Sequence, residues 1–396
     1  MNLIYLGSSR PEVLNKELLD MGSHVDVAGN TLQNSLLQGF FVCIPDVKVI
    51  SAWSVSTYPK VKKIKFSRRD IAYIGIKKYV YVGGWNLPVI NLFSRFLRAR
   101  KELKRTLSNA EDNYVLVYET HTPFMLAAAT LRKRIKHINL IVPDLPEFMS
   151  SNQGRLYLLL KSIDRCIINW CIKRFDSFTL LSASMTERLA IGNKPWTVME
   201  GIYQPPMEVL DSPKDTNKVI FYGGHLDRRY GILDLLEAFI QIKGEDYRLL
   251  ICGKGDSVPI IQEYARKDNR IQFLGLISRS EVIGWQKKAT VLVNPRHANE
   301  EYTKYSFPSK TIEYLASGTP VVMHRLGCMT KEYDSFVFYA EDDSVEALRE
   351  KLYEVCEKSR EELAYFGGKA REFILLKKTS KAQCLKILDL IIKDNH

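Results

Sequence analysis

The chain has 396 residues, of which 46% are hydrophobic and 26% charged, and its formal net charge is +12. This length exceeds what a single hydrophobic core supports, so we expect two domains. No run of about 18 uncharged apolar residues is present, which argues against a membrane-spanning helix, and the seven scattered cysteines fit neither a disulfide framework nor zinc-ligand spacing.

Strands and helices alternate in the first half of the chain. The opening residues MNLIYLGSSRPE have no basic segment before an apolar stretch, so we expect no secretory signal and a cytoplasmic location. We predict strands at 2–7, 24–29, 114–119, 138–144 and 177–183, and helices at 11–22, 123–134 and 154–174.

The second half alternates more regularly. Residues 231–242 keep apolar side chains at the i, i+3, i+4 and i+7 positions of one helical face. Strands that alternate with helices at this spacing predict a parallel, doubly wound sheet. We predict strands at 218–224, 247–255, 270–276, 290–296 and 319–324, and helices at 231–242, 257–267, 280–289, 305–318 and 361–396.

The predicted fold class is therefore α/β, with two Rossmann-like domains that each contain a doubly wound parallel sheet. Prolines and polar residues gather at 202–217, which indicates a linker. The first domain is then 1–201 and the second 218–375. The remaining residues, 376–396, are expected to form a helix that can pack back on the first domain.

The segment YSFPSKTIEYLASGTPVV, residues 305–322, combines a helix start with charged side chains. Pro308 fits the first turn of a helix, Ser306 or Ser309 can cap it, and Gly318 can end it.

Lys310 lies in the first turn of this predicted helix, and Glu313 follows one turn later on the same face. Free N–H groups at a helix start attract anions, and a lysine adds a full positive charge. A carboxylate repels phosphate but can accept hydrogen bonds from the two hydroxyl groups of a ribose. The pair therefore predicts a site for a nucleoside diphosphate.

A second candidate lies in FYGGHLDRRYG, where Gly223 and Gly224 follow a predicted strand and Arg228 and Arg229 precede a helix. Glycines at this point let a ligand approach the backbone, and arginine suits phosphate oxygens. The alternative interpretation is an ordinary turn with two exposed arginines.

FYGGHLDRRYGILDLLEAF and NPRHANEEYTKYSFPSKTIEYLASGTPVV together resemble the donor-binding half of family-4 glycosyltransferases of the GT-B fold, in particular a bacterial polysaccharide branch that carries FPSK. The resemblance implies two Rossmann-like domains that face a central cleft. Glu313 matches the second glutamate of the E-x7-E pair of that family, whereas Tyr305 stands at the first. This chain also differs from the family at the phosphate clamp, where it has Gly224 and Tyr230.

The residues that we assign to the donor on this basis come from four segments of the second half. They are Gly223, Gly224, Arg228, Arg229, Lys254, Arg296, Ser306, Phe307, Pro308, Ser309, Lys310 and Glu313.

The acceptor side is expected in the first domain. The resemblance places a residue close to the reacting sugar at the end of a strand, where this chain has Asp144, and His121 likewise follows a strand. Asp144 before Leu-Pro is equally a good turn residue, and His121 can be a structural residue at a helix start. The family retains the anomeric configuration, so either residue can serve to position the acceptor hydroxyl group.

Positive charge is concentrated in residues 1–195, which hold 28 Lys and Arg against 15 Asp and Glu. Clusters at 59–69, 95–105 and 131–137 are either solvated faces or contacts with an anionic partner, nucleic acid or membrane. Residues 84–105 join apolar and aromatic side chains to six cations, as in an interfacial helix or a core helix with a basic outer face. We expect peripheral contact with the inner face of the cell membrane and a lipid-linked acceptor.

The expected activity is that of a retaining glycosyltransferase that moves a hexose from a nucleotide sugar to a growing bacterial surface glycan. No Asp-x-Asp motif is present, and we expect neither a metal nor another cofactor, with lysine, arginine and the helix start stabilising the leaving diphosphate. A nucleotide-sugar epimerase would share the architecture and need no acceptor. A basic nucleic-acid-binding protein is the other alternative, although no recognisable binding module supports it.

Overall fold

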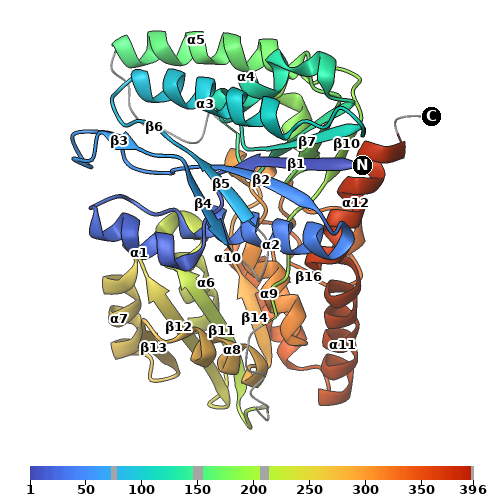
Figure 1. The fold of residues 1–396 in the computed structure, drawn as a ribbon. Coiled ribbons are helices and arrows are strands. Elements are labelled where there is room, and N and C mark those ends of the chain that lie inside the picture. Colours follow the sequence, from blue (N-terminus) through green and yellow to red (C-terminus); the bar gives the residue numbers. More distant parts are fainter. Residues whose placement is uncertain (73–77, 146–154, 206–213, 394–396) are drawn as a thin grey trace. The chain divides into compact units, whose positions relative to one another are not determined.

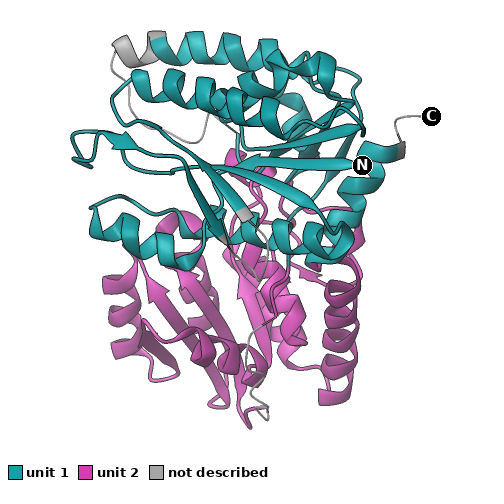
Figure 2. Ribbon diagram, viewed as in Figure 1, with its two compact units in different colours: residues 1–202, 380–396 teal, residues 203–379 magenta. Residues whose placement is uncertain are grey.

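The computed structural model describes residues 1–72, 78–145, 155–205 and 214–393. The chain divides into two compact units, shown in Figure 2. Unit 1 contains Met1–Ile202 together with Ser380–His396, and unit 2 contains Tyr203–Thr379. The predicted linker 202–217 lies partly outside the described residues. No helix in the described part of the chain is both long enough and apolar enough to cross a membrane.

Unit 1 is built on an eight-stranded sheet with the order β10-β9-β8-β7-β1-β2-β5-β4. Neighbouring strands run parallel except β4, which pairs antiparallel with β5. The strands are β1 (Asn2–Gly7), β2 (Val47–Ala52), β4 (Arg69–Ala72), β5 (Lys78–Val82), β7 (Asn113–Tyr118), β8 (His137–Val142), β9 (Ser177–Leu180) and β10 (Trp196–Val198), and β3 (Lys65–Phe66) pairs separately with β6 (Gly84–Trp85).

Helices cover this sheet, so its central strands are buried along their whole length. Figure 1 shows α3, α4 and α5 gathered together on one side of the sheet, where α4 packs against both of its neighbours. The helices are α1 (Glu12–Asp20), α2 (Val27–Cys43), α3 (Ile90–Thr106), α4 (Thr122–Thr130), α5 (Arg155–Ile172) and α12 (Ser380–Lys393), with short 3-10 turns η1 (Arg132–Arg134) and η3 (Ala183–Glu187).

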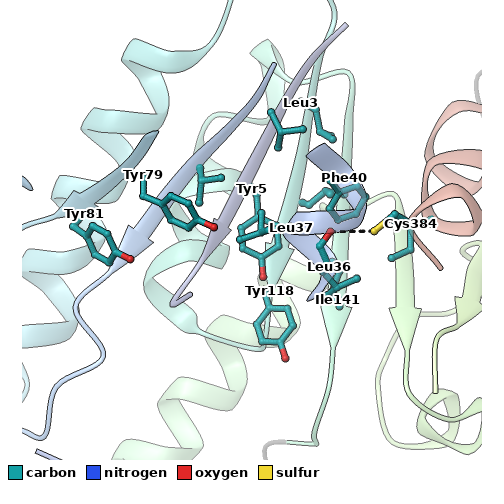
Figure 3. Close-up of a cluster of buried hydrophobic side chains, with 14 of the residues drawn as sticks. Leu3, Tyr5, Leu36, Leu37, Phe40, Tyr79, Tyr81, Tyr118, Ile141 and Cys384 are labelled. Atoms are coloured by element: carbon teal, nitrogen blue, oxygen red, sulfur yellow. Dashed lines mark hydrogen bonds between the residues drawn. The ribbon is translucent and has the colours of Figure 1, made fainter. Parts of the chain in front are cut away.

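The carboxyl-terminal helix α12 completes the core of unit 1. In Figure 3 the side chain of Cys384 lies beside Leu36 and Phe40 of α2, and its Sγ donates a hydrogen bond to the Leu36 carbonyl oxygen over 3.1 Å. The two helices approach closely at Gly39, where a Cβ atom would lie 2.3 Å from the Ser380 carbonyl oxygen. Only glycine fits there without a shift of the backbone.

Unit 2 contains a six-stranded, wholly parallel sheet with the order β13-β12-β11-β14-β15-β16. The order reverses between β11 and β14, the switch point at which doubly wound sheets bind ligands. The strands are β11 (Lys218–His225), β12 (Tyr247–Lys254), β13 (Ile271–Gly275), β14 (Val291–Asn294), β15 (Val321–Met323) and β16 (Phe338–Tyr339).

Helices connect these strands and cover both faces of the sheet, with separate hydrophobic clusters on the two sides. They are α6 (Ile232–Ile240), α7 (Val258–Lys267), α8 (Arg279–Lys288), α9 (Ser309–Ser317), α10 (Val345–Cys356) and α11 (Arg360–Lys377), with 3-10 turns η4 (Arg228–Tyr230), η5 (Glu301–Lys304) and η6 (Lys331–Tyr333). The α/β class with two doubly wound sheets is confirmed.

The strand predicted at 24–29 is wrong. Asp26 instead caps α2, accepting a hydrogen bond from the Gly29 backbone N–H over 3.0 Å, and the next strand is β2. The inward face of α2 includes the buried polar residues Asn30, Gln33 and Ser35 among its apolar side chains. These polar residues hide the helical period, so the sequence did not indicate this helix.

Candidate functional site

The helix α9 begins at the predicted position, between β14 and β15 at the switch point of unit 2. Pro308 occupies its N-cap position and Gly318, in the left-handed region with φ of 80°, its C-cap. The expectation that Ser306 or Ser309 caps this helix is wrong, because no side-chain cap is present at this described helix end. The Thr311 N–H donates to the Pro308 carbonyl oxygen over 2.8 Å, so the preceding N–H groups of Ser309 and Lys310 are the ones that an anion can use.

Lys310 reaches from this helix start to the end of β11. Its Nζ donates a hydrogen bond to the Gly223 carbonyl oxygen over 2.7 Å and lies 5.3 Å from the centre of the Tyr222 ring. A Cβ atom on Gly224 would lie 1.2 Å from this Nζ. Glycine at 224 is therefore what admits the lysine.

The pKa of Lys310 is lowered to about 8, first by burial and then by the positive charge of Arg296. An anion bound beside the ammonium group would stabilise its charged form and so raise the pKa of Lys310 again. The site thus holds a positive charge that lacks a carboxylate close enough to keep its pKa at the ordinary value.

Tyr314, one turn beyond Lys310, fixes the same strand end. Its hydroxyl accepts a hydrogen bond from the Gly223 N–H over 3.0 Å and lies 3.2 Å from the Gly223 carbonyl oxygen. The side chain is buried. Tyr314 was not predicted as a site residue, because a buried tyrosine on an amphipathic helix is typical of a core position.

Glu313 lies on the cavity side of α9 and is half-buried. Gln286 of α8 donates a hydrogen bond from Nε2 to Glu313 Oε1 over 3.2 Å. Gln286 is itself buried, so the amide orients the carboxylate. Gln286 was not predicted.

A cavity of about 400 Å³ connects these groups at the carboxyl ends of β11 and β12. One region is formed by Gly224 and Lys310, and Glu313 contributes a carboxylate to the same wall. The lining residues are Gly223, Gly224, His225, Cys252, Gly253, Lys254, Leu276, Ile277, Arg279, Val282, Gln286, Lys310 and Glu313. Five of the twelve predicted donor residues line it: Gly223, Gly224, Lys254, Lys310 and Glu313.

Arg296 lies near the cavity without lining it. Its guanidinium group lies 4.3 Å from the centre of the Tyr230 ring, and its charge acts on Lys310. The carbonyl oxygen of Arg296 accepts a hydrogen bond from Nδ1 of the buried His324 over 2.9 Å. Asp343 accepts hydrogen bonds from two backbone N–H groups that follow in the same loop.

The other predicted donor residues lie outside the cavity lining. Arg228 and Arg229 are exposed on η4, and Arg229 pairs with Asp227 over 3.3 Å. Phe307 is buried in a hydrophobic cluster of unit 2, 5.5 Å from Tyr333 between ring centres, and its predicted contact with the donor stays a prediction. Three more precede or begin α9: Ser306 is half-buried, Pro308 buried and Ser309 exposed.

His121 lies at the N-cap of α4, at the carboxyl edge of the unit 1 sheet. Its Nε2 lies 3.0 Å from Nη1 of Arg95, which also donates to the Trp53 carbonyl oxygen over 3.1 Å. Burial and the Arg95 charge hold the pKa of His121 well below its ordinary value, and burial lowers the pKa of Arg95 to about 10. The imidazole is therefore neutral and accepts from Arg95 at Nε2.

Asp144 follows β8 at the same edge and is joined by two carboxylates that the sequence analysis missed. Glu119 has φ of 69°, rare for a residue other than glycine, and its pKa is raised to about 7 by burial and by the charges of Asp26 and Asp144. Burial and Asp26 raise the pKa of Asp144 as well. The positive φ of Glu119 and its proximity to Asp26 and Asp144 arise from the folded structure, so no local sequence pattern predicts them.

Within the described residues, no group of three or more His, Cys, Asp or Glu side chains is placed to hold a metal ion.

Solved structures share the fold of the chain. A lipopolysaccharide outer core galactosyltransferase, WaaB, in its apo form is 17% identical with a TM-score of 0.65, and each chain is covered to 100%. Sucrose-phosphate synthase from Thermosynechococcus elongatus is 16% identical with a TM-score of 0.64, covering 100% of this chain and 99% of its own.

A variant of S. aureus TarM, solved with Fondaparinux, alpha-GlcNAc-glycerol and UDP, is 10% identical with a TM-score of 0.55, covering 99% of this chain and 100% of its own. These likenesses confirm the predicted GT-B architecture.

No curated protein matches the sequence significantly. The family model for glycosyl transferases group 1 matches residues 216–358, less than half of the chain. This segment contains every residue that lines the cavity of unit 2. The part of the chain that builds the cavity thus carries the sequence pattern of glycosyl transferases group 1.

Proposed function

We propose that the chain is a retaining glycosyltransferase that moves a hexose from a nucleotide sugar to a glycan acceptor. The observation that carries the proposal is the placement of Lys310, Glu313 and Gly224 in one cavity. The match of residues 216–358 to glycosyl transferases group 1 supports it.

The diphosphate of the donor would lie over the start of α9. Lys310 already presents its ammonium group to the carbonyl oxygen of Gly223, and a phosphate oxygen can replace or join that acceptor. Free N–H groups of the first turn add partial positive charge. As the bond between sugar and phosphate breaks, negative charge grows on the leaving diphosphate, and these fixed groups stabilise it. The proposal requires no metal ion.

Glu313 would bind the ribose of the nucleotide. A carboxylate accepts hydrogen bonds from both adjacent hydroxyl groups, and the hydrogen bond from Gln286 to Oε1 fixes its orientation. The apolar residues Leu276 and Ile277 line the same cavity and can pack against the base. The protein would thus bind each part of the nucleotide with a matching chemical group.

The acceptor would bind at the carboxyl edge of unit 1. His121 is neutral and engaged by Arg95, so we assign it a positioning role rather than that of a proton donor. Asp144 and Glu119 can accept hydrogen bonds from sugar hydroxyl groups. Two structural relatives, an outer core galactosyltransferase and a TarM variant solved with UDP, support a surface-glycan acceptor in exopolysaccharide, capsule or O-antigen synthesis.

We further propose that the acceptor is lipid-linked and that the protein binds peripherally to the inner face of the cell membrane. Ile90, Leu92, Phe93 and Leu97 on the first half of α3 are all exposed, while its buried side includes Ala99 and Leu103. Apolar residues followed by cations along one exposed helix suit a membrane interface. Salt-sensitive binding to anionic vesicles, reduced by Phe93→Ser with Leu97→Ser, would support this contact.

The test combines ligand stabilisation with a reaction assay. A panel of nucleoside diphosphates and nucleotide sugars should contain one compound that raises the Tm of the protein, because a ligand that binds only the folded state stabilises it. With that nucleotide sugar, nucleoside diphosphate should be released only after a glycan acceptor is added. Conversion of the donor alone would instead identify an epimerase, and stabilisation by oligonucleotides alone would identify a nucleic-acid-binding protein.

A further inference from the structure

A second cavity, open and about 690 Å³ in volume, lies in unit 1 at the amino ends of neighbouring parallel strands. Its charged lining comes from the segments that precede β8, β9 and β10. His121 and Asp144 lie at the opposite, carboxyl edge of the same sheet. We call this cavity the basic pocket, because its charged lining residues are Arg132, Lys136, Lys173, Arg174 and Lys194 against the single carboxylate Asp176.

Asp176 does not neutralise these cations. Its Oδ1 accepts a hydrogen bond from Arg132 over 2.6 Å, and its Oδ2 accepts one from the Ile138 backbone N–H over 2.7 Å. Lys136 pairs with Asp112 over 2.6 Å, outside the lining. Lys173, Arg174 and Lys194 have no carboxylate within the lining other than Asp176.

Lys194 is held in the pocket by backbone groups. Its Nζ donates hydrogen bonds to the carbonyl oxygens of Ile172 over 2.8 Å and Phe175 over 2.5 Å. Burial lowers the pKa of Lys194; the Asp176 carboxylate acts to raise it and Arg132 to lower it. The fold therefore holds the Lys194 ammonium group where it is partly desolvated, and a bound anion would offset that cost.

Two exposed tryptophans flank the basic pocket. The guanidinium group of Arg174 stacks 3.5 Å from the centre of the Trp170 ring, and Trp196 directly follows the lining residue Pro195. The two indoles are 40% and 42% exposed. Arg174 Nη1 also donates to the Trp170 carbonyl oxygen over 3.0 Å, so the stacked guanidinium group is held in place. Exposed tryptophan beside cations is typical of proteins at the headgroup level of a bilayer.

We propose that the basic pocket binds a phosphate group, carried either by an anionic lipid headgroup or by a soluble phosphate compound. The arginine and lysine donors match the oxygens of a phosphate. This site is separate from the donor cavity of unit 2 and goes beyond the proposed function.

The test compares two variants with the same loss of charge. Lys173→Gln with Arg174→Gln removes two cations of the basic pocket. Lys16→Gln with Lys381→Gln removes two exposed cations of unit 1 that lie outside both the pocket and α3. Lys136→Gln is an independent single variant of the pocket. Circular dichroism establishes that each variant folds.

Inorganic phosphate is titrated calorimetrically into each protein at low ionic strength, in the Lys310→Met background to remove the donor site. We expect the pocket variant to bind phosphate at least about tenfold more weakly than its parent, and the control variant within about twofold. In parallel, sedimentation with phosphatidylglycerol and phosphatidylcholine vesicles identifies the source of the phosphate group.

Weakened phosphate binding without a change in vesicle binding assigns a soluble ligand. Weaker binding of the pocket variant to phosphatidylglycerol vesicles assigns a lipid headgroup. Equal effects of the pocket and control variants on both probes overturn the proposal, as does tighter binding to a single-stranded oligonucleotide than to either probe. Donor binding to unit 2 is measured separately with nucleoside diphosphates, so a failure there does not affect this result.

Discussion

The Nζ of Lys310 lies 2.7 Å from the carbonyl oxygen of Gly223, and this hydrogen bond joins the start of α9 to the end of β11. The contact places a buried positive charge at the switch point of the unit 2 sheet. Because the Gly223 carbonyl oxygen is a neutral acceptor, a diphosphate would offer the lysine a better partner.

Lys310→Met should weaken the binding of the nucleoside diphosphate about ten- to a hundredfold, because a charge-assisted hydrogen bond to phosphate is lost. Isothermal titration calorimetry measures the Kd. The control is Lys243→Met, an exposed lysine of the same unit that does not line the cavity. Equal affinities of the two variants would contradict the role of Lys310.

Gly224→Ala should weaken donor binding about as much as Lys310→Met does, because the added methyl group would occupy the position of the Lys310 Nζ. The matched control is Gly368→Ala on the exposed face of α11, where an added Cβ meets nothing within 4 Å. That variant should bind normally and gain up to about 1 kcal/mol in stability, because alanine is the better helix former. Normal donor binding by the Gly224 variant would show that donor binding does not require Lys310 in its position beside Gly223 and Gly224.

Glu313→Gln should reduce the affinity for ribonucleotides about tenfold, because the amide accepts hydroxyl hydrogen bonds less strongly than a carboxylate. The affinity for the matching 2′-deoxynucleotide should change little. Competition binding with both nucleotides measures the ratio, and Glu237→Gln on the exposed face of α6 is the control. An unchanged ribo-to-deoxy ratio would remove Glu313 from the ribose site.

Donor affinity should fall as the pH rises through about 8, because the pKa of free Lys310 is lowered to about 8 and only the charged form attracts phosphate. Calorimetry at pH 8.5 in buffers of different ionisation enthalpy should detect proton uptake on binding. The free energy of unfolding depends on pH in the opposite direction. Between the folded-state pKa of Lys310, about 8, and its ordinary pKa of 10.5, the unfolded chain binds more protons than the folded one. The contribution of Lys310 to the free energy of unfolding therefore increases with pH in this range. Lys310→Arg should remove the proton uptake.

Tyr314→Phe should lower the free energy of unfolding by about 1–3 kcal/mol, because the buried N–H of Gly223 loses its acceptor. Urea denaturation measures the change, with the exposed Tyr365→Phe as the control. A loss no larger than that of the control would mean that another group satisfies the Gly223 N–H.

The sequence predicted unit 2 well because its central strands are short, largely buried apolar runs between amphipathic helices. The positions of Lys310 and Glu313 in the first turns of α9 and the left-handed cap at Gly318 follow from residue types with strong local preferences. Their arrival in one cavity with Gly224 depends on the parallel order of β11 and β14, which the alternating pattern already implied.

The features that were missed depend on contacts between distant segments. Gln286 reaches Glu313 from another helix, and Glu119 adopts its conformation only within the folded edge of unit 1. Asp26 is a helix cap whose role was hidden by the buried polar face of α2. The exposure of Arg228 and the burial of Phe307 likewise depend on packing, which residue type alone does not determine.

The last helix of the chain supplies Cys384, Ile387 and Leu388 to the interior of unit 1. All of unit 2 is therefore synthesised before the residues of α12 that complete the hydrophobic core of unit 1. Until then, the first 202 residues lack part of their hydrophobic core and leave an apolar seam open. Premature termination before Ser380 would leave that seam permanently uncovered and would favour aggregation of the truncated product.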